Sequence, residues 1–268
     1  MLQQTQVARV IPKYREFLAR FPTIRSLAAT PLRDVLKCWS GLGYNRRAKH
    51  LWDCARIVAS QHRGRVPRDV DILRALPGVG RYTAGAIASF AFGAHEPAVD
   101  TNVRRVISRA VIGTNRASES EVWNRAREVL PHDAARWNHA LMDVGALFCR
   151  ATPRCGECPL RNVCAWAERK LRPTTGLKLG YHKSTALGHE VGLASRKSAR
   201  YQGSRRQHRG RVIRALTNAP SLSLMQLGPQ VKDGFGKTDL AWLHDLLADL
   251  EREGLVALNS ARTRAALP

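Results

Sequence analysis

Apolar residues recur three and four positions apart throughout residues 1–167, whereas the strict alternation expected of half-buried strands is scarce. Two clear examples are VARVIPKYREFLARF and LKCWSGLGYNRRAKHLWDCARIVASQH. A third segment, TAGAIASFAFG, is rich in small apolar residues and predicts a buried helix. Helix-breaking residues separate such segments, namely Pro22, Pro31, Gly64, Pro67, Pro77 and Pro97. The pattern predicts an all-α domain over residues 1–167.

The composition changes after residue 167 and again near residue 205. Residues 168–204 are basic, rich in glycine and serine and poor in large apolar residues, which is typical of a flexible linker. Residues 205–268 are periodic again, and RRQHRGRVIRALTNA and LAWLHDLLADLEREGLVAL predict two amphipathic helices. Because EGLVAL has the pattern of a helix end followed by a short strand, we expect a small, winged-helix-like module there.

The chain carries 44 Lys and Arg against 21 Asp and Glu, a formal net charge of +23. Such a surface attracts polyanions, and nucleic acid is the first expectation; a basic surface that binds nothing is the alternative. No run of 18 apolar residues and no secretory signal occur. We therefore expect a cytoplasmic protein that does not engage a membrane.

The segment LPGVGRYTAGAI, residues 76–87, predicts a tight turn between two helices. Pro77 cannot continue a helix, and Gly78 and Gly80 permit a sharp backbone reversal. Such a turn leaves unpaired backbone N–H groups at the start of the next helix, where they suit a DNA phosphate. An ordinary corner between two helices is the alternative.

Four of the six cysteines are clustered at residues 149–164 with the spacing C-x5-C-x2-C-x5-C. They are Cys149, Cys155, Cys158 and Cys164. In a chain without secretory features, four thiolates this close indicate a metal site rather than disulfides. The spacing alone leaves zinc and an iron–sulfur cluster as alternatives. The remaining Cys38 and Cys54 fit small core positions.

In combination, these motifs resemble the helix–hairpin–helix DNA glycosylases of the endonuclease III superfamily. MLQQTQV at residues 1–7 and GLGYNRRAKHL at residues 41–51 look specifically like the MutY-like, A/G-specific adenine glycosylases. The resemblance runs from residue 1 to about 165. It implies two helical modules, an iron–sulfur loop at residues 149–164 and a 4Fe–4S cluster held by the four cysteines. The family usually has six residues between its first two cysteines, and this chain has five.

The resemblance also implies a reaction and three residues that carry it out. A monomer would bind double-stranded DNA and hydrolyse the N-glycosidic bond of adenine opposite 8-oxoguanine or guanine. Asp100 would stabilise the cationic sugar, as carboxylates do in glycoside hydrolysis, and Asn102 would orient the site. From spacing alone, Asp100 reads as a helix cap. Tyr82 stands where strand-cleaving relatives carry lysine, which predicts base removal without strand cleavage.

Other positions match residues that contact DNA in the family. Gln4 and Tyr44 would insert into the duplex, with Tyr44 beside the guanine lesion, although a packing role for Tyr44 is the alternative. His139 would contact the extruded adenine, and a structural histidine is its alternative. The hairpin would bind phosphate through Gly78, Gly80, Arg81 and Thr83.

Two departures from the family pattern bear on the expected activity. In the family, the glutamate that protonates the leaving adenine stands two residues before the position of Met1. We therefore expect the true start to lie upstream, with a genuinely inactive derivative as the alternative, and we expect little or no excision by residues 1–268 alone. The tail is shorter and more helical than the NUDIX-like domain of many relatives, so lesion recognition by it is not expected. Two alternatives remain, namely a thymine or uracil mismatch glycosylase and a noncatalytic DNA-binding derivative.

Overall fold

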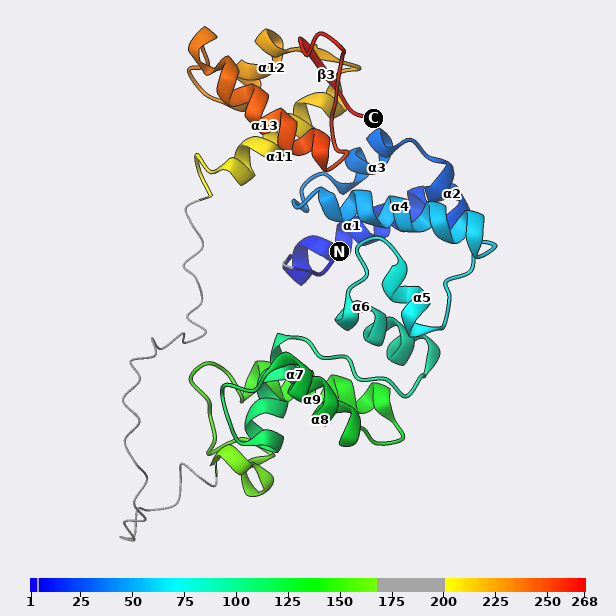
Figure 1. Ribbon diagram of the computed structural model, residues 1–268, viewed down its shortest axis with the longest axis vertical. Coiled ribbons are helices and arrows are strands. Elements are labelled where there is room, and N and C mark those ends of the chain that lie inside the picture. The colour runs from blue at the N-terminus through cyan, green and yellow to red at the C-terminus, as the bar shows by residue number, and fades with distance from the viewer. Residues whose placement is uncertain (4, 168–200) are drawn as a thin grey trace. The chain divides into compact units, whose positions relative to one another are not determined.

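The computed structural model describes residues 1–3, 5–167 and 201–268, which form two compact units (Figure 1). Unit 1 comprises Met1–Pro67, Leu76–Gly78 and Arg196–Pro268, and unit 2 comprises Arg68–Ala75 and Val79–Ser195. Gln4 and most of the predicted linker lie outside the described residues. Among the helices that are described, none combines the length and apolar character needed to cross a membrane.

Unit 1 begins with four helices whose ends follow the prolines and polar caps of the sequence. They are α1 (Val7–Arg20), α2 (Ile24–Ala29), α3 (Leu32–Trp39) and α4 (Arg46–Gln61). Thr23 caps α2 by accepting a hydrogen bond from the Ser26 backbone N–H, and α3 begins directly after Pro31. The buried residues of α3 fall on one face, as the apolar spacing predicted.

The tail forms the second part of unit 1. It contains α11 (Arg205–Asn218), β1 (Leu222–Ser223), α12 (Leu224–Val231), η4 (Lys237–Asp239), α13 (Leu240–Arg252), β2 (Ala257–Leu258) and β3 (Arg264–Ala266). The strands form an antiparallel sheet in the order β1-β3-β2, and the three helices pack together beside it (Figure 1). This is the element order of a winged helix. Sequence analysis predicted α11, α13 and one strand. It missed α12, because Gly228 and Pro229 are unfavourable inside a helix, and it missed the short strands β1 and β3.

The tail and the N-terminal helices share one apolar core. Val212 and Leu216 of α11 belong to the same buried cluster as Leu36 and Trp39 of α3. Arg33 on α3 donates a hydrogen bond of 3.1 Å to the Leu216 carbonyl, near the C-terminal end of α11. A shared core of this kind fixes the tail against α3, because separating them would expose apolar side chains of both.

Unit 2 contains the remaining helices and a second apolar cluster. Its elements are α5 (Val70–Ala75), α6 (Arg81–Ala86), η1 (Ile87–Ala91), α7 (Thr101–Val106), η2 (Ile107–Ile112), α8 (Glu119–Glu128), α9 (Ala134–Leu147) and η3 (Arg161–Val163). The small apolar segment TAGAIASFAFG is helical as predicted, because α6 continues directly into η1, where the helix widens to a π-helix. The second cluster joins α7, η2, α8 and α9.

A glycine allows α9 to approach α7 closely. A Cβ atom at Gly145 would lie 2.5 Å from the Cβ of Asn102 and 3.0 Å from its Cα, closer than atoms of a packed core can be. Asn102 lies in the first turn of α7. Glycine in the middle of a helix is unfavourable for the helix itself, so its presence here follows from packing.

We expect Gly145→Ala to lower the free energy of unfolding by about 1–3 kcal/mol, because the added methyl overpacks the contact with α7. Gly210 in α11 is the matched control, since its nearest neighbour to an added Cβ is the Tyr201 hydroxyl at 4.0 Å. Gly210→Ala is expected to stabilise by about 0.5–1 kcal/mol through helix propensity. Urea unfolding followed by circular dichroism measures both, and equal effects would contradict the packing argument.

Candidate functional site

The hairpin between α5 and α6 requires glycine at residue 78. Gly78 has φ +75°, a left-handed conformation, and an added Cβ would lie 2.7 Å from the Cβ and Nδ1 atoms of His50. Gly80 is the N-cap of α6 and offers no side-chain acceptor to the first N–H groups of that helix. No side chain caps these N–H groups, which suits an anion, and phosphate binding by the hairpin stays a prediction.

Arg81, the first residue of α6, lies against an aromatic ring. Its guanidinium stands 4.0 Å from the centre of the Trp123 ring on α8. The pKa of Arg81 is lowered, by burial first and then by the charges of Arg127 and Arg74. Arg74 and Arg127 pair with carboxylates, at 3.4 Å to Asp71 and 3.9 Å to Glu96. The two acids thus pair with Arg74 and Arg127, and Arg81 lies against the Trp123 ring beside these pairs.

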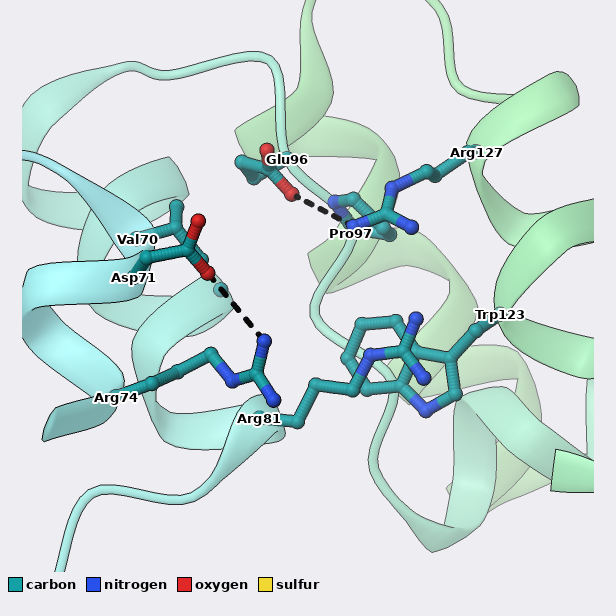
Figure 2. Close-up of a pocket in the computed structure, with 9 residues that line it drawn as sticks. Val70, Asp71, Arg74, Arg81, Glu96, Pro97, Trp123 and Arg127 are labelled. Carbon is teal, nitrogen blue, oxygen red and sulfur yellow. Dashed lines mark hydrogen bonds and ion pairs between the residues drawn. The ribbon is translucent and has the colours of Figure 1, made fainter. Parts of the chain in front are cut away.

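These side chains line a small cavity (Figure 2). Its volume is about 100 Å³, below the roughly 300–1,000 Å³ of ligand pockets. Its small size gives no reason to place an extruded nucleoside there. Three arginines against two acids leave it electropositive.

Asp100 is held by three hydrogen bonds at the start of α7. Its Oδ1 atom accepts from the backbone N–H groups of Asn102 at 2.9 Å and Val103 at 2.7 Å, so it caps the helix. Its Oδ2 atom accepts from the side-chain amide of Asn102 at 3.2 Å. Arg105 donates to the Asn102 side-chain oxygen at 2.8 Å and to the Gly145 carbonyl at 2.7 Å. The carboxylate is therefore fixed in orientation through a chain that reaches α9.

Tyr82 and Asp100 come from different elements of unit 2 and interact electrostatically. The pKa of the Tyr82 phenol is raised, by burial first and then by the charge of Asp100. Tyr82 is 37% exposed, so a ligand can reach it. The phenol keeps its proton near neutral pH, because both effects disfavour the phenolate.

His139 is exposed on α9 and stacks on Phe90 of η1. The ring centres are 4.2 Å apart and the planes differ by 19°. A planar platform of this kind can stack on a nucleobase. Its predicted contact with adenine stays a prediction.

The GLGY loop of unit 1 has three residues in left-handed conformations, with φ +92° at Gly41, +68° at Gly43 and +48° at Tyr44. Arg47 stabilises this loop, since it donates to the Leu42 carbonyl at 3.2 Å and also to the Thr5 hydroxyl at 2.9 Å. The segments MLQQTQV and GLGY, predicted to enter DNA together, are therefore joined by one arginine.

The four clustered cysteines lie around a loop that follows α9, and all four are free and partly buried. The pKa of Cys158 is raised, by burial first and then by the other three thiols, so each of the three lies within electrostatic reach of Cys158. Arg109 is 7% exposed, and it donates to Cys149 Sγ at 3.6 Å and to the Arg150 carbonyl at 2.6 Å. Among the residues the structure describes, no three metal-binding side chains converge as one ion would require.

Known proteins share this architecture and these motifs. A family model described as "HhH-GPD superfamily base excision DNA repair protein" matches residues 1–132. The adenine DNA glycosylase of Mycolicibacterium smegmatis is 40% identical over 249 residues, covering 91% of this chain and 75% of that protein. The chain belongs to the adenine DNA glycosylase family. The predicted family and helix–hairpin–helix fold are confirmed.

Other relatives align with different shares of this chain. The Mycobacterium tuberculosis enzyme of the same name is 40% identical over 91% of this chain and 73% of that protein. The human one is 42% identical over 63% of this chain and 32% of its own length. A solved thermostable thymine-DNA glycosylase is 32% identical with a TM-score of 0.58, covering 63% of this chain and 80% of that chain. A match covering 91% of 268 residues must extend into residues 205–268, so the mycobacterial relatives share part of the tail.

Members of this family generally carry a 4Fe–4S cluster. The donor set here fits such a group, because it consists of four thiols with no imidazole or carboxylate among them. Arg109 adds a donor to Cys149 Sγ, the kind of hydrogen bond that stabilises an anionic cluster.

Asn138 is a buried polar residue of unit 2 that sequence analysis missed. It is 1% exposed on α9. Its side-chain oxygen accepts from the Ala98 N–H at 3.0 Å, and its amide donates to the Glu96 carbonyl and the Ser89 hydroxyl, each at 3.0 Å. It therefore fixes the segment that leads into Asp100. The available signal was a polar residue in the buried stripe of α9, between Ala134 and Leu141.

We expect Asn138→Ala to destabilise the protein by about 1–3 kcal/mol, because the buried Ala98 N–H loses its acceptor. Asn124→Ala, at an exposed position of α8, is the control and should change stability by less than about 0.5 kcal/mol. Urea unfolding measures the difference. Equal stability of the two variants would show that Asn138 is not needed to hold this segment.

Proposed function

We propose that this chain removes adenine from double-stranded DNA in which the adenine is paired with 8-oxoguanine or guanine. The reaction is hydrolysis of the N-glycosidic bond without strand cleavage. The observation that carries the proposal is the fixed carboxylate of Asp100 beside the protonated phenol of Tyr82. Two solved relatives with TM-scores of 0.56 and 0.55 are endonuclease III–DNA complexes, which supports DNA as the partner.

DNA binding follows from charge and from the hairpin. A net charge of +23 draws the duplex to the surface. The N–H groups after Gly80 bind a backbone phosphate, and Thr83 lies in the same turn of α6. These contacts carry no sequence information, so they position the protein without selecting the base.

Base removal requires the adenine to leave the stack and the bond to the sugar to break. As the base departs, positive charge develops on the sugar, and the Asp100 carboxylate stabilises that charge. Because its hydrogen bonds hold Asp100 in place, no reorganisation is needed when the charge appears. Tyr82 has no amine and cannot form a Schiff base, so the strand is not cut. The leaving adenine also needs a proton, and a positioned acid contributes about 10²–10⁴-fold.

We propose that Cys149, Cys155, Cys158 and Cys164 hold a 4Fe–4S cluster. The cluster would fix the loop after α9 by joining four points of the chain. Arg109 and Arg105 support the same loop through Cys149, since Arg109 donates to its sulfur and Arg105 to its carbonyl. The group is assigned a structural role, because the excision step as proposed uses no electron transfer.

A second candidate function is removal of thymine or uracil from a mismatch. The observation in its favour is the 32% identity to a thymine-DNA glycosylase. The adenine assignment has more support, because 40% identity extends over 91% of the chain. A panel of duplexes holding A opposite 8-oxoguanine, A opposite G, T opposite G and U opposite G separates the two by which base is released.

We expect Asp100→Asn to reduce adenine release by about 10²–10³-fold, because the charge that stabilises the sugar is lost. Asparagine caps a helix as well as aspartate does, so the unfolding midpoint should hardly change. Single-turnover release from A opposite 8-oxoguanine is the measurement. It is run with residues 1–268, for which little or no release is expected, and with a preceding segment that supplies glutamate two residues before Met1, in which the loss is measured.

Asp133 provides the matched control, because its side chain caps α9 through the Arg136 N–H. Asp133→Asn should leave release unchanged. Full release by the Asp100→Asn protein would show that Asp100 only caps α7 and does not contribute to adenine release. Binding without release of any base, by either form of the chain, would favour the noncatalytic reading.

We expect the purified protein to contain about four irons and four sulfides per chain, as a 4Fe–4S cluster requires. Cys155→Ser should lose this iron, together with absorbance in the visible range. Cys54→Ser is the control, because Cys54 lies in α4 and outside the loop. Elemental analysis decides the matter, and one zinc per chain without sulfide would replace the cluster assignment with a zinc site.

A further inference from the structure

The arginines of α11 are mostly engaged inside the tail. Arg205 pairs with Asp245 at 2.8 Å and also contacts Asp249. Arg209 pairs with Glu253 at 2.5 Å, and Arg211 with Asp233 at 3.1 Å. These ion pairs, made by three arginines, offset much of the positive charge of the helix, so they argue against α11 as a broad phosphate-binding surface.

Arg206 makes a different contact, outside the tail but within unit 1. Its Nη1 atom donates a hydrogen bond of 2.9 Å to the hydroxyl of Tyr44, 162 residues earlier in the chain. Its guanidinium also lies 5.6 Å from the centre of the Tyr44 ring and 5.1 Å from that of Tyr201. Arg47 lies 5.3 Å from the Tyr44 ring. The tyrosine thus has two cationic neighbours, one from α4 and one from the tail.

Tyr44 combines an unfavourable backbone conformation with an exposed side chain, so neighbouring contacts must fix its position. Its φ of +48° is left-handed, and it is 41% exposed. A left-handed backbone is unfavourable for a residue with a Cβ. Arg47 binds the carbonyls of the loop, including that of Gly43 at 3.3 Å, but it makes no hydrogen bond with the Tyr44 hydroxyl. The hydroxyl is held by Arg206.

The remainder of the tail gives little reason to expect direct contact with DNA. On α13, Asp245 and Asp249 pair with Arg205, so these charges offset one another and offer little net attraction to a phosphate. The shared apolar core holds α11 firmly against α3, which ends two residues before the GLGY loop. Arg206 is therefore presented to Tyr44 from a fixed helix.

We propose that Arg206 is a positioning residue for Tyr44, and that the tail contributes to opposite-base recognition through this side chain. The proposal rests on the proposed function and on the expectation that Tyr44 lies beside the base opposite adenine. Arg206 fixes the ring by its hydroxyl and face, so that the loop meets the duplex in one conformation. Pre-organisation of this kind strengthens binding of the correct duplex without adding a contact to it.

The test is a double-mutant cycle on DNA binding, carried out in the Asp100→Asn protein so that no adenine is released. Fluorescence anisotropy gives Kd for a duplex with A opposite 8-oxoguanine and for a fully paired duplex. The measured quantity is the ratio of the two Kd values. We expect Arg206→Ala to lower this preference by about tenfold, as loss of one charge-assisted hydrogen bond would.

Two comparisons make the result specific. Arg214→Ala removes an equal charge from an exposed position of the same helix and should leave the ratio within about twofold. In a Tyr44→Ala background, Arg206→Ala should have no further effect, because the residue through which it acts is absent. Arg206→Lys can still donate a hydrogen bond and should retain most of the preference.

Each contrary result has a distinct meaning. If Tyr44→Ala lowers the preference and Arg206→Ala does not, this inference is wrong and the proposed function stands. An equal loss of affinity for both duplexes, with a weaker salt dependence, would make Arg206 a phosphate contact and overturn the inference. If the protein without substitutions at Tyr44 or Arg206 shows no preference, the proposed substrate fails together with the inference.

Discussion

The close approach of α9 to α7 at Gly145 is the contact on which the site in unit 2 depends. Without a Cβ at this position, the Gly145 carbonyl accepts a hydrogen bond from Arg105, and Arg105 then holds the Asn102 side chain. Asn102 in turn binds Asp100. Arg105 also contacts the carbonyl of Cys149, where the cysteine loop begins. The absence of a side chain at Gly145 therefore allows Arg105 to fix both Asp100, through Asn102, and the backbone at Cys149.

Asp100 shows how a structural and a catalytic role can coincide. A helix N-terminus stabilises a carboxylate, and its N–H groups fix the orientation of that carboxylate. Both effects are useful for a charge that must face a developing cation. The capping observed in the structure therefore does not compete with the proposed role. Capping uses mainly Oδ1, whereas Oδ2 accepts one side-chain bond from Asn102 and retains capacity for a further contact.

Sequence reasoning reached those features that are encoded locally. Helical periodicity predicted most of the helices but not α12, where Gly228 and Pro229 interrupt the pattern. The PGVG turn and the cysteine spacing identified their motifs without three-dimensional information. It did not reach β1 and β3, because strands of two or three residues carry no measurable alternation. It also missed Asn138, whose partners lie more than 39 residues away along the chain. Buried polar contacts of this length depend on tertiary packing, which one sequence does not display.

The contact of Arg206 with Tyr44 also joins residues far apart in the sequence, so it could not be predicted from the sequence. From sequence, α11 is a helix with five arginines, and nonspecific phosphate binding and plain packing are equal readings. The structure separates the arginines by partner, since three meet acids of the tail and Arg206 meets a tyrosine of the GLGY loop. The net charge of α11 alone therefore overestimates how much of it is available to bind phosphate. In this basic helix, Arg206 is distinguished by its partner, which is a tyrosine outside the tail rather than an acid within it.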